Sequence, residues 1–194
     1  MVRGDRGNMI AKTEPKKIIT LDGISVLKAW KPGALHFYGL DERDPQAYRR
    51  ALYLAHLNGD LLDWDVIGNL VVNIGLQHAG DMLIDQESIG IIRHALGDDG
   101  TTPAIGDSTL TSEHVRKVWS NRSRSLQTIE FSVFYLGSEA NIYIREEGCF
   151  GGTSCTASVD TGLLFSHYLQ PYDNTGGSPV DLTFDWSVEI KRSA

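Results

Sequence analysis

The last segment of the chain constrains the fold more than any other. From residue 180 to residue 191, apolar side chains alternate without a break with polar ones. The apolar set is Val180, Leu182, Phe184, Trp186, Val188 and Ile190. A period of two is the signature of a β-strand with one buried and one solvated face. We therefore predict a strand of about 40 Å that buries Phe184 and leaves Asp185 in water, where Asp185→Asn would change little.

The composition agrees with a chain that builds its own core. Of the 194 residues, 41% are hydrophobic, which suffices for one large β domain or for a domain with an appendage. The sequence has neither an apolar stretch of transmembrane length nor a signal-peptide core near residue 1, so we expect no membrane partner. Cys149 and Cys155 are expected to be small core or turn residues, with a local disulfide as the alternative.

Charge is distributed unevenly along the chain. The first 35 residues hold seven Lys or Arg against three Asp or Glu, whereas the remainder holds eleven against twenty-two. An acidic body repels phosphate, so we expect no nucleic-acid partner. A basic arm suits an acidic protein surface, and a solvated tail is the alternative. The docking candidates are Arg3, Arg6, Lys12, Lys16, Lys17 and Trp30.

Strand and turn signals recur along the chain. Residues 17–38 are expected to form one or two short strands broken at Asp22-Gly23 and at Lys31-Pro32-Gly33. Further strands are predicted at 89–96, 126–136, 141–147 and 163–169, the middle two as a β-hairpin.

Two segments have helical patterns. A helix is predicted from Asp44 as N-cap and Pro45 in the first turn up to a stop at Asn58-Gly59. A second helix is predicted over Gly75–Ile84.

These elements predict a mainly β fold. We expect a jelly-roll-like antiparallel β-sandwich with an extended N-terminal arm and one or two short helices. The expected divisions are an arm with short strands over 1–40, a connector helix region over 41–68 and the sandwich domain over 69–194.

The sequence lacks the motifs of catalysis and cofactor binding. It has no glycine-rich phosphate loop, no closely paired histidines and no nucleophile elbow. We therefore expect no enzymatic activity, no catalytic residue and no cofactor. The turn-rich segment 97–107 carries Asp98, Asp99 and Asp107, which are candidate calcium ligands, but their spacing is not that of an EF-hand and a surface loop is preferred.

Several short motifs occur in a fixed order between residues 69 and 186. They are Asn69-Leu70-Val71-Val72-Asn73-Ile74-Gly75, Ala95-Leu96-Gly97, Asp107-Ser108-Thr109-Leu110, Glu139-Ala140-Asn141, Glu147-Gly148-Cys149-Phe150 and Leu182-Thr183-Phe184-Asp185-Trp186. In this order they resemble a widespread group of tailed-bacteriophage virion proteins. The residues expected to define the fold are Leu110, Glu113, Arg116, Glu147, Gly148, Phe150, Phe184 and Trp186.

The resemblance implies a non-enzymatic structural protein of the virion, synthesised in the bacterial host cytoplasm. Its expected partners are other virion proteins, either the major capsid protein or tail proteins, and further copies of itself in a dimer or trimer. The first hypothesis is a capsid-decorating (cement) protein docked by its arm, and the second is a tail baseplate or fibre component.

A third hypothesis belongs to another class, a carbohydrate-binding or cell-attachment module. Aromatic side chains on such modules stack against sugars, although aromatics on strands are more often part of a core. The aromatic residues that suggest it are Trp30, Tyr38, Trp64, Trp119, Tyr143 and Tyr172.

Overall fold

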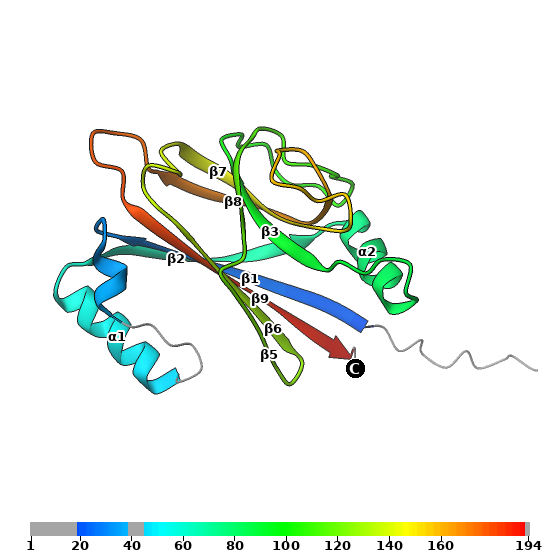
Figure 1. Cartoon of the computed structure of the whole chain (residues 1–194), viewed down its shortest axis with the longest axis horizontal. Helices are drawn as coiled ribbons and strands as arrows, with labels where there is room; N and C mark the ends of the chain where they lie inside the picture. The colour runs from blue at the N-terminus through cyan, green and yellow to red at the C-terminus, as the bar shows by residue number, and fades with distance from the viewer. Residues whose placement is uncertain (1–18, 39–44, 193–194) are drawn as a thin grey trace, which may run out of the picture.

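The structure is a computed structural model that describes residues 19–38 and 45–192. This part of the chain forms nine strands, two α-helices and one short 3-10 helix (Figure 1). The strands are β1 (Ile19–Trp30), β2 (Leu61–Val71), β3 (Ile91–Gly97), β4 (Glu113–Val118), β5 (Asn121–Ser125), β6 (Thr128–Tyr135), β7 (Tyr143–Gly151), β8 (Leu163–Asp173) and β9 (Asp181–Arg192). The helices are η1 (Ala34–Phe37), α1 (Pro45–Leu57) and α2 (Asn73–Leu83).

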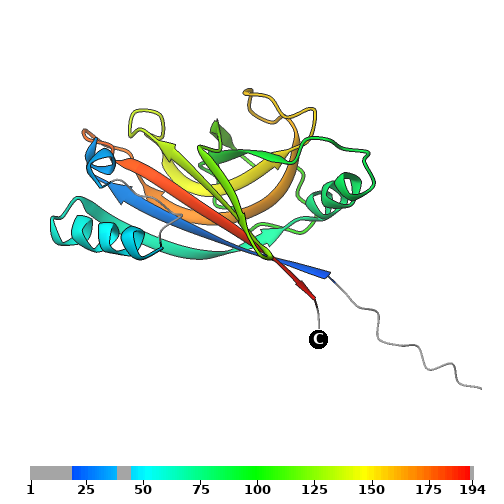
Figure 2. The same ribbon diagram turned by 60° about the horizontal axis from the view of Figure 1, so that its bottom comes forward.

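The strands form two antiparallel five-stranded sheets that share β2. The order is β4-β3-β7-β8-β2-β1-β9-β6-β5. Sheet A comprises β2, β1, β9, β6 and β5, and sheet B comprises β4, β3, β7, β8 and β2. The two sheets diverge from β2, and Figure 2 shows sheet B curving over sheet A. The predicted mainly β sandwich is confirmed, while jelly-roll connectivity is not confirmed by this order.

β9 lies inside sheet A and supplies much of the core, as its alternating pattern predicts. It pairs with β1 along its whole length and with β6 on its other side. Phe184 and Trp186 are almost fully buried, and the Trp186 ring lies 5.0 Å from that of Phe131. The opposite face of β9 is drier than predicted, because Asp181 is also buried and accepts hydrogen bonds from the backbone N–H groups of Gly33 and Gly137.

The predicted division of the N-terminal third is wrong. β1 continues through Asp22-Gly23 without a break, because it is hydrogen-bonded to β2 on one side and to β9 on the other. β2, which was expected to be part of a connector, completes sheet A. The sandwich therefore includes residues 19–30 and 61–68, which the predicted boundaries place outside it.

Trp30 is not a docking residue. Its side chain is fully buried, and its Nε1–H donates to Thr183 Oγ1 at 3.1 Å. It packs with Leu61 and with Ala55 of α1, which covers this end of sheet A. The other docking candidates, Arg3, Arg6, Lys12, Lys16 and Lys17, lie outside the described residues, as does the predicted N-cap Asp44.

Both predicted helices are present. α1 starts at Pro45 and ends before Asn58-Gly59, where Gly59 adopts a φ of 67° and the Asp60 N–H donates to the Ala55 carbonyl. A left-handed residue after the last turn is the usual way to satisfy the free carbonyls of a helix end. α2 overlaps its predicted range and packs on β8.

The predicted hairpin between residues 126–136 and 141–147 is wrong. β6 pairs with β9 and β5, whereas β7 pairs with β3 and β8 in the other sheet. The segment between β6 and β7 therefore carries the chain from one sheet to the other. β5 was missed because its sequence, NRSRS, has no apolar alternation.

Candidate docking surface

The outer face of sheet A, on the side away from the sandwich core, carries the features that suit a binding surface. Directly paired residues of neighbouring antiparallel strands share one face. The register therefore places on this face Ile24, Val26 and Lys28 of β1, Trp64 and Val66 of β2, Asp185 and Ser187 of β9, and Glu130 of β6. α1 covers only one end of the face (Figure 1).

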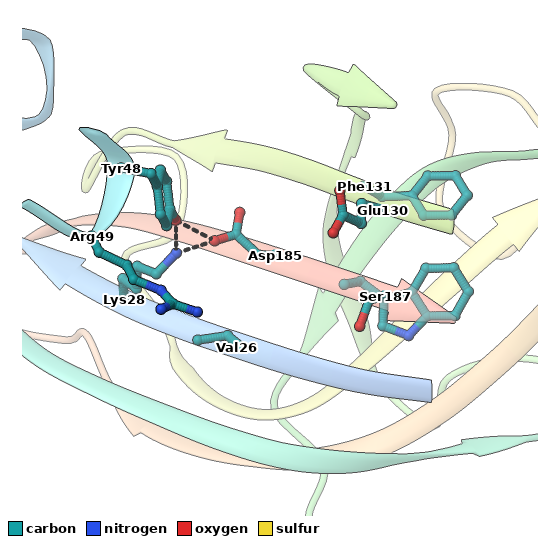
Figure 3. A pocket seen from close by; sticks show the side chains of 9 residues that line it. Val26, Lys28, Tyr48, Arg49, Glu130, Phe131, Asp185 and Ser187 are labelled. Carbon is teal, nitrogen blue, oxygen red and sulfur yellow. Dashed lines mark hydrogen bonds and ion pairs between the residues drawn. The ribbon is translucent and has the colours of Figure 1, made fainter. Parts of the chain in front are cut away.

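A groove of about 380 Å³ separates the first turns of α1 from the sheet (Figure 3). Tyr48 and Arg49 line it from the helix, and the outer-face residues of β1, β9 and β6 line it from below. Arg49 is exposed, so its guanidinium is available to a partner that enters the groove.

A buried ion pair fixes α1 to the floor of the groove. Lys28 is 5% exposed, and its ammonium donates to the Asp185 carboxylate and to the Tyr48 hydroxyl. The Tyr48 hydroxyl donates in turn to Asp185 Oδ2 at 3.0 Å, and the Lys28 Nζ lies 5.0 Å from the Tyr48 ring centroid (Figure 3). A buried ammonium is costly unless it is paired, so these three side chains hold the groove in one shape.

The structure therefore revises the expectation for Asp185. We expect Asp185→Asn to lower the free energy of unfolding by about 1–3 kcal/mol, because it leaves the buried Lys28 ammonium without its counter-charge. Urea denaturation followed by tryptophan fluorescence measures the change. Glu189→Gln is the matched control on the same strand and face, where an exposed pair with Lys191 predicts a change of about 1 kcal/mol or less. Equal losses for the two variants would contradict the role of the ion pair.

Beyond α1, the outer face is apolar and open to solvent. We call the residues Ile24, Val26, Trp64 and Val66 the outer strip. Trp64 and Val66 are each 61% exposed, and Ile24 is 47% exposed. The Trp64 ring stacks on His56 of α1, with centroids 6.5 Å apart and planes at 22°. Exposed apolar patches of this kind mark interaction sites, and Trp is the residue most enriched among binding hot spots.

Comparison with known proteins yields no match. No family model, no curated protein and no solved structure matches the chain. None of the described helices is both long enough and apolar enough to cross a membrane. The interpretation of the outer strip therefore depends on its own geometry.

Most residues that were expected to define the fold meet at one place on sheet B. The Arg116 guanidinium pairs with Glu113 through two bonds of 2.5 and 2.6 Å and lies 4.5 Å from the Phe150 ring centroid. Arg116 Nη1 also donates to the Thr161 carbonyl at 2.7 Å, which fastens the loop after β7. Leu110 and Phe150 share a small apolar cluster beside this pair.

Gly148 packs closely against that cluster. A Cβ at this position would lie 2.9 Å from side-chain carbons of Leu110 and Leu164, closer than real packing allows. A larger residue at this position would therefore have to displace the buried Leu110 or Leu164 side chain.

Glu147 belongs to a polar network between the two sheets. Its Oε2 accepts hydrogen bonds from His94 Nε2 at 2.8 Å, from Ser25 Oγ at 3.4 Å and from the Tyr168 hydroxyl. Burial, together with the charge of Glu147, raises the pKa of Tyr168 well above its usual value, so this phenol stays a donor. These side chains are buried in the core and connect β1, β3, β7 and β8.

The three candidate calcium ligands do not converge. Asp98 pairs with His114 at 3.0 Å, Asp99 accepts from the Thr101 N–H at 2.7 Å, and Asp107 contacts His167 Nδ1 at 2.7 Å. Among the described residues, no three His, Cys, Asp or Glu side chains are placed to hold a metal ion. The calcium alternative is therefore not supported, because each carboxylate organises its own part of the loop.

His167 connects this loop to the core. Burial alone would lower its pKa, but its contacts with Glu146 and Asp107 raise the pKa above the usual value. Glu146 also accepts the backbone N–H groups of Thr111 and Ser112, which hold the loop against β7.

The cysteine prediction is confirmed. Cys149 and Cys155 are both free and buried. Burial raises the pKa of each thiol, which keeps both of them in the unreactive neutral form.

The aromatic residues that suggested sugar binding do not form one platform. Trp30 and Trp119 are buried, and the exposed Trp64 and Tyr143 lie on β2 and β7, between which β8 lies in the strand order. Sequence reasoning noted Trp64 only as one member of this set. Its exposure depends on how far α1 reaches over β2, and no local sequence signal reports that distance.

Proposed function

We propose that the chain is a non-enzymatic structural protein of a phage virion, and specifically a capsid-decorating protein. It docks on a capsid protein through the outer strip, aided by its basic N-terminal arm, and it associates with copies of itself. The observation that carries the proposal is the exposure of Trp64 and Val66 on the outer face of sheet A. The sequence resemblance to virion proteins supports the choice of partner.

The outer strip has the composition that is typical of a docking surface. Its centre is apolar, and its ring residue is already oriented by the stack on His56, so little side-chain freedom is lost on binding. Charged side chains of both signs, Arg49 and Glu130, lie at one side of it. An apolar centre with a polar rim is the general anatomy of protein interfaces.

The basic arm precedes β1 and can reach a neighbouring subunit. Eighteen residues come before Ile19, and a chain of this length spans at most roughly 60 Å when extended. The arm is therefore long enough to contact an acidic surface while the outer strip is engaged.

A binding assay with purified particles tests the proposal. We expect the protein to co-sediment with particles, and Trp64→Ser to weaken binding about tenfold or more, as loss of a hot-spot residue does. Deletion of residues 2–16 should weaken binding with the fold retained. Ile105→Ser is the matched control, since Ile105 is equally exposed on a loop between β3 and β4. Binding of Trp64→Ser at wild-type strength would refute docking through the outer strip.

Labelling the protein on intact particles tests its location. Labels on the capsid shell support decoration, and labels confined to the tail would replace decoration by a baseplate or fibre role with the same docking surface.

A further inference from the structure

Sheet A has two open edges. β5 is the last strand in the order, so no other described strand pairs with its outer side. β2 is bonded to β1 along residues 61–69, but it meets β8 only at Leu70 and Val71. Among the described residues, no strand is paired with the middle of β2 on the side away from β1, where the contact from β8 is the Gln170 side chain on Asp65. Open strand edges readily pair with another chain, and proteins control this with charged side chains.

The two edges carry opposite charges at matching spacing. Asp63 and Asp65 are exposed on β2, and Arg122 and Arg124 are exposed on β5. Asp63 and Asp65 pair with Ala29 and Leu27 of β1, which are core residues. Arg124 and Arg122 pair with Ile129 and Phe131 of β6, which also face the core. All four charged residues therefore lie on the same face of sheet A, at its opposite margins.

We propose that copies of this chain associate head to tail, with β5 of one copy adding to the open edge of β2 of the next. Two β5 edges repel each other through their arginines, and two β2 edges repel each other through their aspartates. Only the pairing of a β5 edge with a β2 edge, which we call the joint, is therefore favoured. In a five-stranded antiparallel sheet the two outer strands run in the same direction, so the joint is a parallel pair. An interface between two different surfaces closes into a ring or continues as a filament.

Two carboxylates of β2 accept hydrogen bonds from backbone N–H groups of the same strand. The N–H groups of Trp64 and Val66 donate to Oδ1 of Asp63 and Asp65, both at 2.8 Å. In the structure these two N–H groups are therefore bonded to side chains of β2 itself. Gln170 contacts Asp65 Oδ2 at 3.3 Å from β8. In the joint, the partner's guanidinium groups attract the carboxylates, and the partner's strand carbonyls accept the released N–H groups.

The proposed joint and the docking surface use different faces of sheet A. The outer strip faces the opposite side of sheet A, so both surfaces can be used at once. The inference specifies the self-association in the proposed function. Because its test needs only the purified chain, it can succeed or fail independently of particle binding.

Analytical ultracentrifugation with charge-reversed variants tests the joint. We expect the wild-type sedimentation coefficient to rise with protein concentration and to fall as salt is raised from about 0.05 M to about 0.5 M. The double variants R122E/R124E and D63K/D65K should each associate at least about tenfold more weakly. An equimolar mixture of the two variants should associate again, because each then meets edges of opposite charge. R50E/R145E is the control, with the same charge change at exposed sites on α1 and β7.

Several outcomes would overturn the inference. They are a wild-type chain that stays monomeric at every concentration, a variant R122E/R124E that associates like the wild type, or a mixture of folded variants that does not recover. Circular dichroism checks the fold of each variant. If D63K/D65K does not fold, D63N/D65N replaces it, and undiminished association of that variant also refutes the joint.

Discussion

Arg116→Ala is expected to lower the free energy of unfolding by about 3–5 kcal/mol, the cost of leaving one charge of a buried pair without its partner. The side chains of Arg116 and Glu113 are 1% and 0% exposed. The substitution leaves the buried Glu113 carboxylate without its counter-charge. It also removes the hydrogen bond from Arg116 to the Thr161 carbonyl that holds the loop after β7. Guanidinium chloride denaturation measures the loss.

The neighbouring residue supplies the control for this prediction. Lys117 is paired with Glu139 at 2.7 Å on the exposed surface, so Lys117→Ala should cost about 1 kcal/mol or less. The double variant E113L/R116M should recover part of the stability of Arg116→Ala, since it removes both buried charges. A loss for Arg116→Ala no larger than that for Lys117→Ala would contradict the structural role of the pair.

Gly75→Ala should destabilise the protein by about 2 kcal/mol or more, against the helix propensity that favours alanine in α2 by about 1 kcal/mol. A Cβ at Gly75 would lie 2.7 Å from the Cα and 2.8 Å from the carbonyl carbon of Phe165. Both are backbone atoms of β8, so neither can move aside as a flexible side chain would. Thermal unfolding followed by circular dichroism measures the effect.

Gly80 lies in the same helix, and its substitution by alanine is expected to stabilise the protein. A Cβ there meets nothing within 4 Å, so Gly80→Ala should stabilise the protein by about 0.5–1 kcal/mol. If both substitutions raise the melting temperature, α2 does not pack on β8 as closely as the structure has it.

The sequence was informative where structure depends on local geometry. The alternation in β9 and in β6 predicts both the strand and its buried face, because successive side chains of a strand point to opposite sides. Pro45 and Gly59 mark the ends of α1 through their own backbone preferences. These signals lie within a few residues of the elements they predict.

Pairing partners were not predictable in the same way. Residues 141–147 read as the return strand of β6, but β9 and β5 occupy both sides of β6. β2 gave no clear strand signal, because most of its side chains are exposed on both faces. For the candidate surface, the sequence named Trp64 without its exposure and treated Trp30 as a docking residue, although it is buried under α1.

The sequence by itself determined that this is a mainly β protein with a C-terminal strand in the core, two helices and a basic N-terminal segment ahead of an acidic remainder. Only the tertiary structure decided which polar residues are buried, where the outer face is left open and which strand edges remain unpaired. The reason is physical: burial is set by contacts between distant residues. Lys28 with Asp185 and Trp30 with Thr183 are each separated by more than 150 positions, and periodicity in a short window carries no record of such contacts.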